Sequence, residues 1–135
     1  MSLLDVVTEG AQELELLEDG LEVTVRIVNL EVVPVKSRPG SSQLSVRFDV
    51  PSNPLADDMY GYVSLPDAAL KESDPKAFSK AVGRFKDFCK CFSVDSSGPI
   101  DSDDFKGMTG DVIVGLEDDP QYGRRNRIKQ YVVGA

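Results

Sequence analysis

The order of the hydrophobic patterns is the feature of this sequence that most constrains its fold. Apolar and polar residues alternate in residues 21–27, and the same alternation returns in residues 43–50 and 59–65. A period of two is typical of a strand with one face on the core and the other in water. Three half-buried strands are therefore predicted in the first half of the chain.

The first of these strands continues past an irregular point. Its alternation breaks at Val28-Asn29-Leu30, which indicates a β-bulge that bends the strand. A bent strand can pair on both sides of a small barrel. Pro39-Gly40 then marks the turn into the second strand.

One principal helix is predicted after the third strand. Ser73 or Asp74 can cap its N-terminus, and Pro75 suits its first turn. Apolar residues follow at helical spacing as far as Phe92, which predicts a stripe packed on the core.

Two further strands, residues 112–116 and 127–133, follow the helix and are joined by the turn-rich segment "EDDPQYGRRN". Three strands, a helix and a closing hairpin is the order of an OB-fold. We therefore predict a mainly β protein with one principal helix, folded as a five-stranded OB-fold barrel with the helix between strands 3 and 4.

Charge divides the chain into two parts. The sequence has 23 acidic and 15 basic residues, a net charge of −8, and residues 1–20 carry −6 of it with no basic residue. We expect an acidic N-terminal arm over residues 1–20 and an OB-fold domain over residues 21–135. The arm is either a solvated tail or a segment that competes with a polyanion or recruits a partner.

The basic residues fall where an OB-fold binds oligonucleotides, on the face of strands 2 and 3 and on the loops joining strands 1 to 2 and 4 to 5. Cations there would contact phosphates, and flat side chains would stack on bases. The alternative is that tyrosines pack across strands and edge cations discourage aggregation. The candidate nucleic-acid-binding residues are Lys36 and Arg38 in the first loop, Arg47, Tyr60 and Tyr62 on the outward face of strands 2 and 3, Tyr122, Arg124 and Arg125 in the second loop, and Arg127, Lys129 and Tyr131 on the outward face of the last strand.

The segment "FKGMTGDVIVGLEDDPQYGRRNRIKQYVV" resembles the C-terminal half of the small single-stranded DNA-binding proteins encoded by bacteriophages, and the helix "FSKAVGRFKDFCKCFSVD" is similar to theirs. The resemblance spans most of residues 18–133. It implies an OB-fold that binds single-stranded DNA largely without sequence preference and protects or organises it in phage replication or recombination, in the host cytoplasm. The matching positions are Gly107, Gly110, Tyr122, Gly123, Asn126, Ile128 and Tyr131.

Catalysis is not expected, because the chain has no histidine, no nucleophile in a recognisable setting and no phosphate-binding loop. "DSDD" at 101–104 could form a magnesium cluster, but the N-terminus of a helix explains these acids more simply, because carboxylates suit the positive end of the helix dipole. Cys89 and Cys91 are interpreted as reduced packing residues, so no metal or cofactor is predicted.

A different class of function remains open: an OB-fold protein-interaction module, such as a phage accessory or virion factor, that does not bind nucleic acid. The expected partners are single-stranded DNA, with replication or recombination proteins as candidates and homo-oligomerisation left open. No apolar run approaches the ~20 residues that cross a bilayer. We therefore expect a cytoplasmic protein that does not bind membranes.

Overall fold

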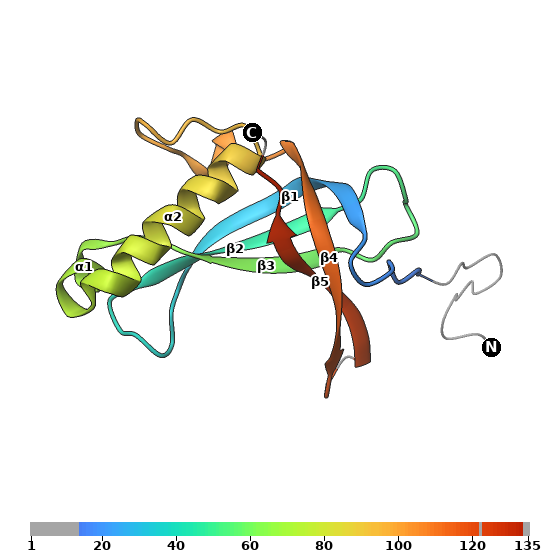
Figure 1. The fold of residues 1–135 in the computed structure, drawn as a ribbon, viewed down its shortest axis with the longest axis horizontal. Coiled ribbons are helices and arrows are strands. Elements are labelled where there is room, and N and C mark those ends of the chain that lie inside the picture. The colour runs from blue at the N-terminus through green and yellow to red at the C-terminus, as the bar shows by residue number, and fades with distance from the viewer. Residues whose placement is uncertain (1–13, 122, 134–135) are drawn as a thin grey trace, which may run out of the picture.

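The structure, a computed structural model, describes residues 14–121 and 123–133. The described residues form one five-stranded antiparallel sheet and one main helix (Figure 1), as predicted. The helices lie between the third and fourth strands. In chain order the elements are β1 (Glu22–Pro34), β2 (Ser42–Asp49), β3 (Met59–Ser64), α1 (Ala68–Ser73), α2 (Pro75–Cys91), the 3-10 helix η1 (Ser102–Asp104), β4 (Thr109–Asp119) and β5 (Gly123–Tyr131).

The sheet is not closed into the barrel that we predicted. Within the described residues, the strand order is β3-β2-β1-β4-β5, so β3 and β5 form the two edges and do not pair with each other. The edges nevertheless approach closely at one point. A Cβ atom built on Gly61 of β3 would lie 3.0 Å from the hydroxyl of Tyr131 in β5.

The bulge predicted in the first strand is confirmed. The pairing of β1 with β2 shifts register between Ile27 and Asn29. Arg26 lies opposite Asp49 of β2 and also opposite Thr109 of β4. The bend therefore occurs where β1 passes from one partner strand to the other.

The β4–β5 hairpin is longer than predicted. Residues 117–126 were expected to form a loop, yet Asp118 pairs with Arg124 and Asp119 with Gly123, close to the tip. Figure 1 shows this hairpin extending beyond the rest of the sheet. Both faces of the outer part of the hairpin can therefore be polar. The sequence there lacks the alternation of apolar and polar residues that indicates a strand, so a loop was predicted.

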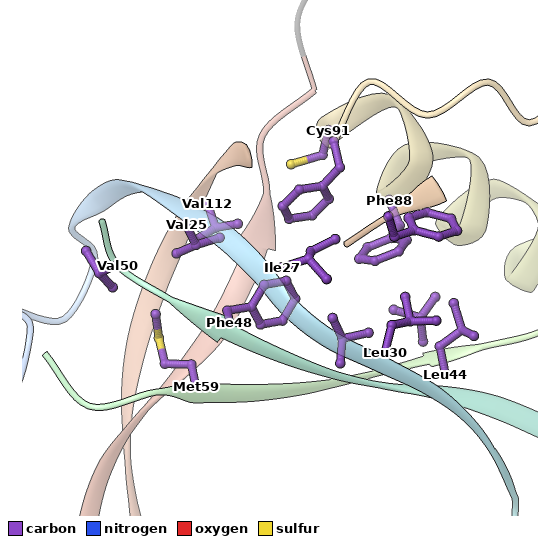
Figure 2. Close-up of a cluster of buried hydrophobic side chains, with 14 of the residues drawn as sticks. Val25, Ile27, Leu30, Leu44, Phe48, Val50, Met59, Phe88, Cys91 and Val112 are labelled. Atoms are coloured by element: carbon purple, nitrogen blue, oxygen red, sulfur yellow. The ribbon is translucent and has the colours of Figure 1, made fainter. Parts of the chain in front are cut away.

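The core lies between the sheet and α2 (Figure 2). Phe88 and Phe92 of the helix are fully buried, and Phe92 stacks on Phe48 of β2 with 5.8 Å between ring centroids. Phe105, which was predicted to anchor the connection to β4, packs on Phe88 at 5.5 Å. The helix therefore covers one side of the sheet, and Tyr60 and Tyr62 of β3 are exposed on the other.

The N-terminus of α2 is as predicted. The Asp74 side chain accepts a hydrogen bond from the Ala77 backbone N–H at 3.1 Å, and Pro75 is the first helical residue. The short helix α1 was not predicted. It is capped by Asp67, whose carboxylate accepts from the N–H groups of Leu70 and Ser42.

Part of the acidic arm, residues 14–20, lies against the sheet. Leu17 is buried, and the side-chain amide of Asn126 both accepts from the Leu17 N–H at 2.7 Å and donates to its carbonyl at 2.9 Å. The Asp19 carboxylate accepts from the Leu116 N–H. This segment therefore packs on the β4–β5 hairpin, whereas residues 1–13, which carry the rest of the predicted arm, lie outside the described residues.

Candidate nucleic-acid interface

Two tyrosines stand on the outer face of β3. Tyr60 and Tyr62 are 53% and 65% exposed, which confirms the outward orientation predicted from the alternation. Tyr60 lies opposite Arg47 of β2, and Tyr62 lies opposite Ser45. Two flat side chains and one cation thus share a small area of the sheet surface.

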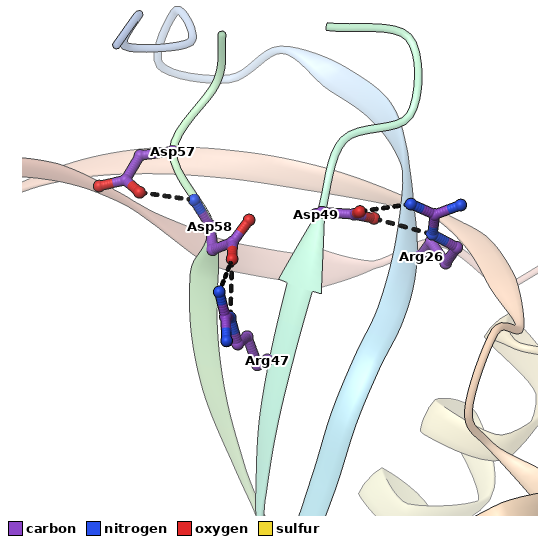
Figure 3. A network of polar contacts seen from close by, with 5 residues as sticks. All are labelled: Arg26, Arg47, Asp49, Asp57 and Asp58. Carbon is purple, nitrogen blue, oxygen red and sulfur yellow. Dashed lines mark hydrogen bonds and ion pairs between the residues drawn. The ribbon is translucent and has the colours of Figure 1, made fainter. Parts of the chain in front are cut away.

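Arg47 is paired with a carboxylate at this face. Its Nε donates to Asp58 at 2.7 Å, and the Asp58 backbone N–H is held in turn by the Asp57 side chain at 2.8 Å. The hydrogen bond and charge of Asp58 raise the pKa of Arg47. Figure 3 shows this pair beside a second pair, Arg26 with Asp49, so a carboxylate balances each of these two arginines.

The three hairpin arginines are also paired, and they lie in β5 where we predicted a loop for the first two. Arg124 contacts Asp118 at 3.3 Å. Arg125 contacts Glu117 at 3.0 Å, and Arg127 lies 3.8 Å from the same carboxylate. All three side chains are about half exposed, and such pairs contribute only ~0–1 kcal/mol each. The basic cluster of the hairpin is therefore largely neutralised by β4.

Tyr131 was predicted to face outward, and the structure shows that it does not. Its ring packs against Phe88 in an edge-on arrangement, with 5.3 Å between centroids, and burial raises its pKa. The register of β4 with β5 shifts so that Lys129 has no opposite residue, which places Ile128 and Tyr131 on the same, inner side. Lys129 remains exposed.

The β1–β2 loop carries two exposed cations, Lys36 and Arg38. Neither forms an ion pair with any residue that the structure describes. The loop and the tip of the β4–β5 hairpin both extend below the strands in the view of Figure 1. Tyr122, the remaining candidate, lies outside the described residues.

The motif that carries the resemblance to phage proteins has a structural explanation. Gly107 has a φ of 82°, and a Cβ on Gly110 would lie 2.6 Å from the Cys91 carbonyl oxygen. Asn126 holds Leu17, while Ile128 and Tyr131 pack on the core. These residues therefore maintain the fold, and the surface candidates lie elsewhere.

A pocket of about 470 Å³ adjoins the tyrosine face, the outer surface of β3 that carries Tyr60 and Tyr62. It lies where the sheet edges β3 and β5 approach each other beside α2, and its lining includes Tyr62, Arg84, Asp87 and Gln130. Arg84 was not among our candidates, because α2 was interpreted only through its apolar stripe. The charges of the helix would have revealed it, since α2 contains five basic residues and one acidic residue.

The acids of "DSDD" act as helix caps. The Asp101 carboxylate accepts from the Asp103 N–H, and the Asp104 carboxylate accepts from the Asp101 N–H, which confirms the interpretation as a helix N-terminus. No group of three or more potential metal ligands occurs among residues 14–121 and 123–133. Cys89 and Cys91 are buried free thiols, and burial raises the pKa of each to about 11.

No protein-family model matches the sequence, and no curated protein matches it. In the part of the chain that the structure describes, neither helix has the length and apolarity needed to cross a bilayer.

Proposed function

We propose that this protein binds single-stranded DNA, largely without sequence preference, on the outer face of β2 and β3. The observation that carries the proposal is the pair Tyr60 and Tyr62, both more than half exposed on one strand and beside Arg47. Exposed aromatic rings next to cations are what a single strand requires, because every base has a face that stacks and every nucleotide has a phosphate.

The connectivity of the sheet supports a partly open OB-fold. β1 is shared between β2 and β4, the helices fall between β3 and β4, and the edges β3 and β5 approach at Gly61 and Tyr131. OB-folds bind oligonucleotides on strands 2 and 3 and on the loops at either side. In this chain those loops correspond to residues 35–41, with Lys36 and Arg38, and to the tip of the β4–β5 hairpin.

The ion pairs of the surface are compatible with phosphate binding. Arg47 and the hairpin arginines are held by exposed carboxylates, and an exposed pair is worth only ~0–1 kcal/mol. A phosphate can therefore replace the carboxylate at small cost, while released counterions favour the complex. With the resemblance to phage proteins, this supports a role in protecting or organising single strands during phage replication or recombination in the host cytoplasm.

Alanine and phenylalanine substitutions at the two tyrosines test the proposal. A stacked base is worth ~1–3 kcal/mol, so Tyr60→Ala or Tyr62→Ala should weaken binding to oligo-dT by roughly fivefold to a hundredfold. Tyr62→Phe keeps the ring and should bind as the parent does. Because both side chains are exposed, the melting temperature should change little. Unchanged affinity in both alanine variants would show that this face is not the binding site.

The second candidate is a protein-interaction module on the same scaffold. It is favoured by the carboxylates that neutralise the hairpin arginines and by the net charge of −8. A module of this kind would show no salt-dependent binding to oligonucleotides, whereas a phosphate-contacting protein loses affinity steeply as salt rises. Salt dependence therefore separates the two functions.

A further inference from the structure

The solvent-facing side of α2 is strongly basic. The helix has a net charge of +4 in a chain whose net charge is −8. Its basic residues, all exposed, are Lys76, Lys80, Arg84, Lys86 and Lys90.

These five cations differ from the paired arginines of the sheet, because they have no ion-pair partner among the described residues. None of them forms an ion pair with a carboxylate anywhere in residues 14–121 or 123–133. Arg47, Arg124 and Arg127, in contrast, are all paired. Among the described residues, α2 therefore carries more basic side chains without an ion pair than the β4–β5 hairpin does, although the sequence had suggested the hairpin.

Three of the cations form a line along the helix. Lys76, Lys80 and Arg84 are four residues apart, so they lie on one face about 6 Å from each other. Phe88, one turn beyond Arg84, is buried, so the line runs from the solvent-facing side at Lys76 towards the edge of the helix that packs on the core. A spacing of one helical turn is comparable with the distance between phosphates of an extended single strand, which would let successive phosphates meet successive side chains.

The line begins beside the tyrosine face. Arg84 and Tyr62 line the same pocket, which opens between β3, β5 and α2. A strand stacked on Tyr62 therefore has a direct route across the pocket to Arg84. No acidic residue other than Asp87 lies on α2 along this route.

We propose that single-stranded nucleic acid leaves the outer face of β3 at Tyr62, crosses this pocket, and runs along α2 with its phosphates on Arg84, Lys80 and Lys76. This inference rests on the proposed function and extends it, because it assigns the phosphate-binding track to the helix. Charge complementarity and continuity with Tyr62 select a single strand as the occupant. The binding surface then continues from the sheet onto the helix.

The test compares two double variants of the same helix. Lys76→Gln with Lys80→Gln removes two charges from the line. Lys86→Gln with Lys90→Gln removes the same charge from the other edge of the exposed face, since Lys86 is turned about 160° away from Arg84. Glutamine and lysine have similar helix propensities, so both variants should fold, as circular dichroism would verify.

The measurement is the salt dependence of binding to oligo-dT of about 16 nucleotides. Each lost phosphate contact lowers the slope of log affinity against log salt by ~0.7, so the first variant should lose ~1.4. When the salt is diluted tenfold, the affinity of the variant should therefore rise roughly 25-fold less than the affinity of the parent does. The second variant should keep the parent slope.

The outcomes separate this inference from the proposed function. If the parent does not bind oligo-dT, both are overturned. If the parent binds and Tyr62→Ala weakens binding, but the Lys76 and Lys80 variant keeps the parent slope, only the helix track is overturned. Equal losses in the two double variants would also overturn it, because they would reflect the general field of the helix and not a defined path.

Discussion

Replacing Asn126 with alanine should detach residues 14–20 from the hairpin. The Asn126 amide accepts from the Leu17 N–H at 2.7 Å and donates to the carbonyls of Leu17 at 2.9 Å and Gly115 at 3.2 Å. All three contacts are partly buried. Asn126→Ala removes them at once and leaves backbone groups without their partner.

The magnitude follows from these contacts. Each net hydrogen bond contributes ~0.5–1.5 kcal/mol, and releasing buried Leu17 into water adds up to ~1.5–3 kcal/mol. Gly20 still donates to the Val114 carbonyl at 2.8 Å, so part of the segment should stay attached. We therefore expect a loss of about 2–4 kcal/mol in the free energy of unfolding.

Urea unfolding of four proteins tests this expectation: the parent, Asn126→Ala, Leu17→Ala and the double variant. If Asn126 acts by holding Leu17, the two effects should not add, and the coupling energy should exceed ~1 kcal/mol. Asn29→Ala is the matched control, because within the described part of the chain the Asn29 amide makes a single exposed contact of 3.5 Å, to Glu31. It should change stability by less than ~0.5 kcal/mol.

Two results would refute this reasoning. The first is an Asn126→Ala protein as stable as the Asn29→Ala control. The second is simple additivity of the Leu17 and Asn126 effects, which would mean that the amide stabilises the hairpin without holding the segment.

Two further predictions concern the packing around Cys91. Gly110→Ala should destabilise the fold by ~1–3 kcal/mol, because the new Cβ would lie 2.6 Å from the Cys91 carbonyl oxygen. Gly115→Ala should be tolerated, because the nearest atom to its Cβ would be 3.5 Å away. Equal melting temperatures of the two variants would contradict this prediction. Burial raises the pKa of Cys89 and Cys91 from 9.0 to about 11, so the thiols of the unfolded chain lose their protons at lower pH than those of the folded protein. The contribution of the thiols to stability should therefore be complete below pH 9. It should decline between pH 9 and pH 11 by up to ~1.4 kcal/mol per pH unit for each thiol. Urea unfolding from pH 8 to 11 should give a flatter profile for the Cys89→Ala, Cys91→Ala protein, and parallel profiles would disprove the thiol contribution.

Local patterns predicted the parts of the fold that local physics determines. Period-two alternation placed Tyr60 and Tyr62 on the outer face, and the broken alternation at Val28 identified the bulge. A cap at Ser73 or Asp74 was predicted because such side chains accept from a free N–H of the first helical turn, and Asp74 accepts from Ala77. Each of these features depends on residues a few positions apart.

Other features depend on partners far along the chain. The inward position of Tyr131 results from a register shift against β4, which no residue of β5 reveals by itself. The pairing of Arg125 with Glu117 likewise follows from the hairpin register. The open edge between β3 and β5 is a tertiary property. The charge of α2, in contrast, could have been counted from the sequence, and it was missed because only the apolar stripe was considered.

The most direct test of the central claim is the anisotropy of a labelled oligo-dT titrated with the protein between about 0.05 M and 0.2 M salt, beside a duplex of equal length. We predict that the single strand binds more tightly than the duplex. Its log affinity should fall linearly with log salt, by ~0.7 for each phosphate contacted. Absence of binding to oligo-dT at the lowest salt, or equal affinity for the duplex, would contradict the proposal that this protein binds single-stranded DNA.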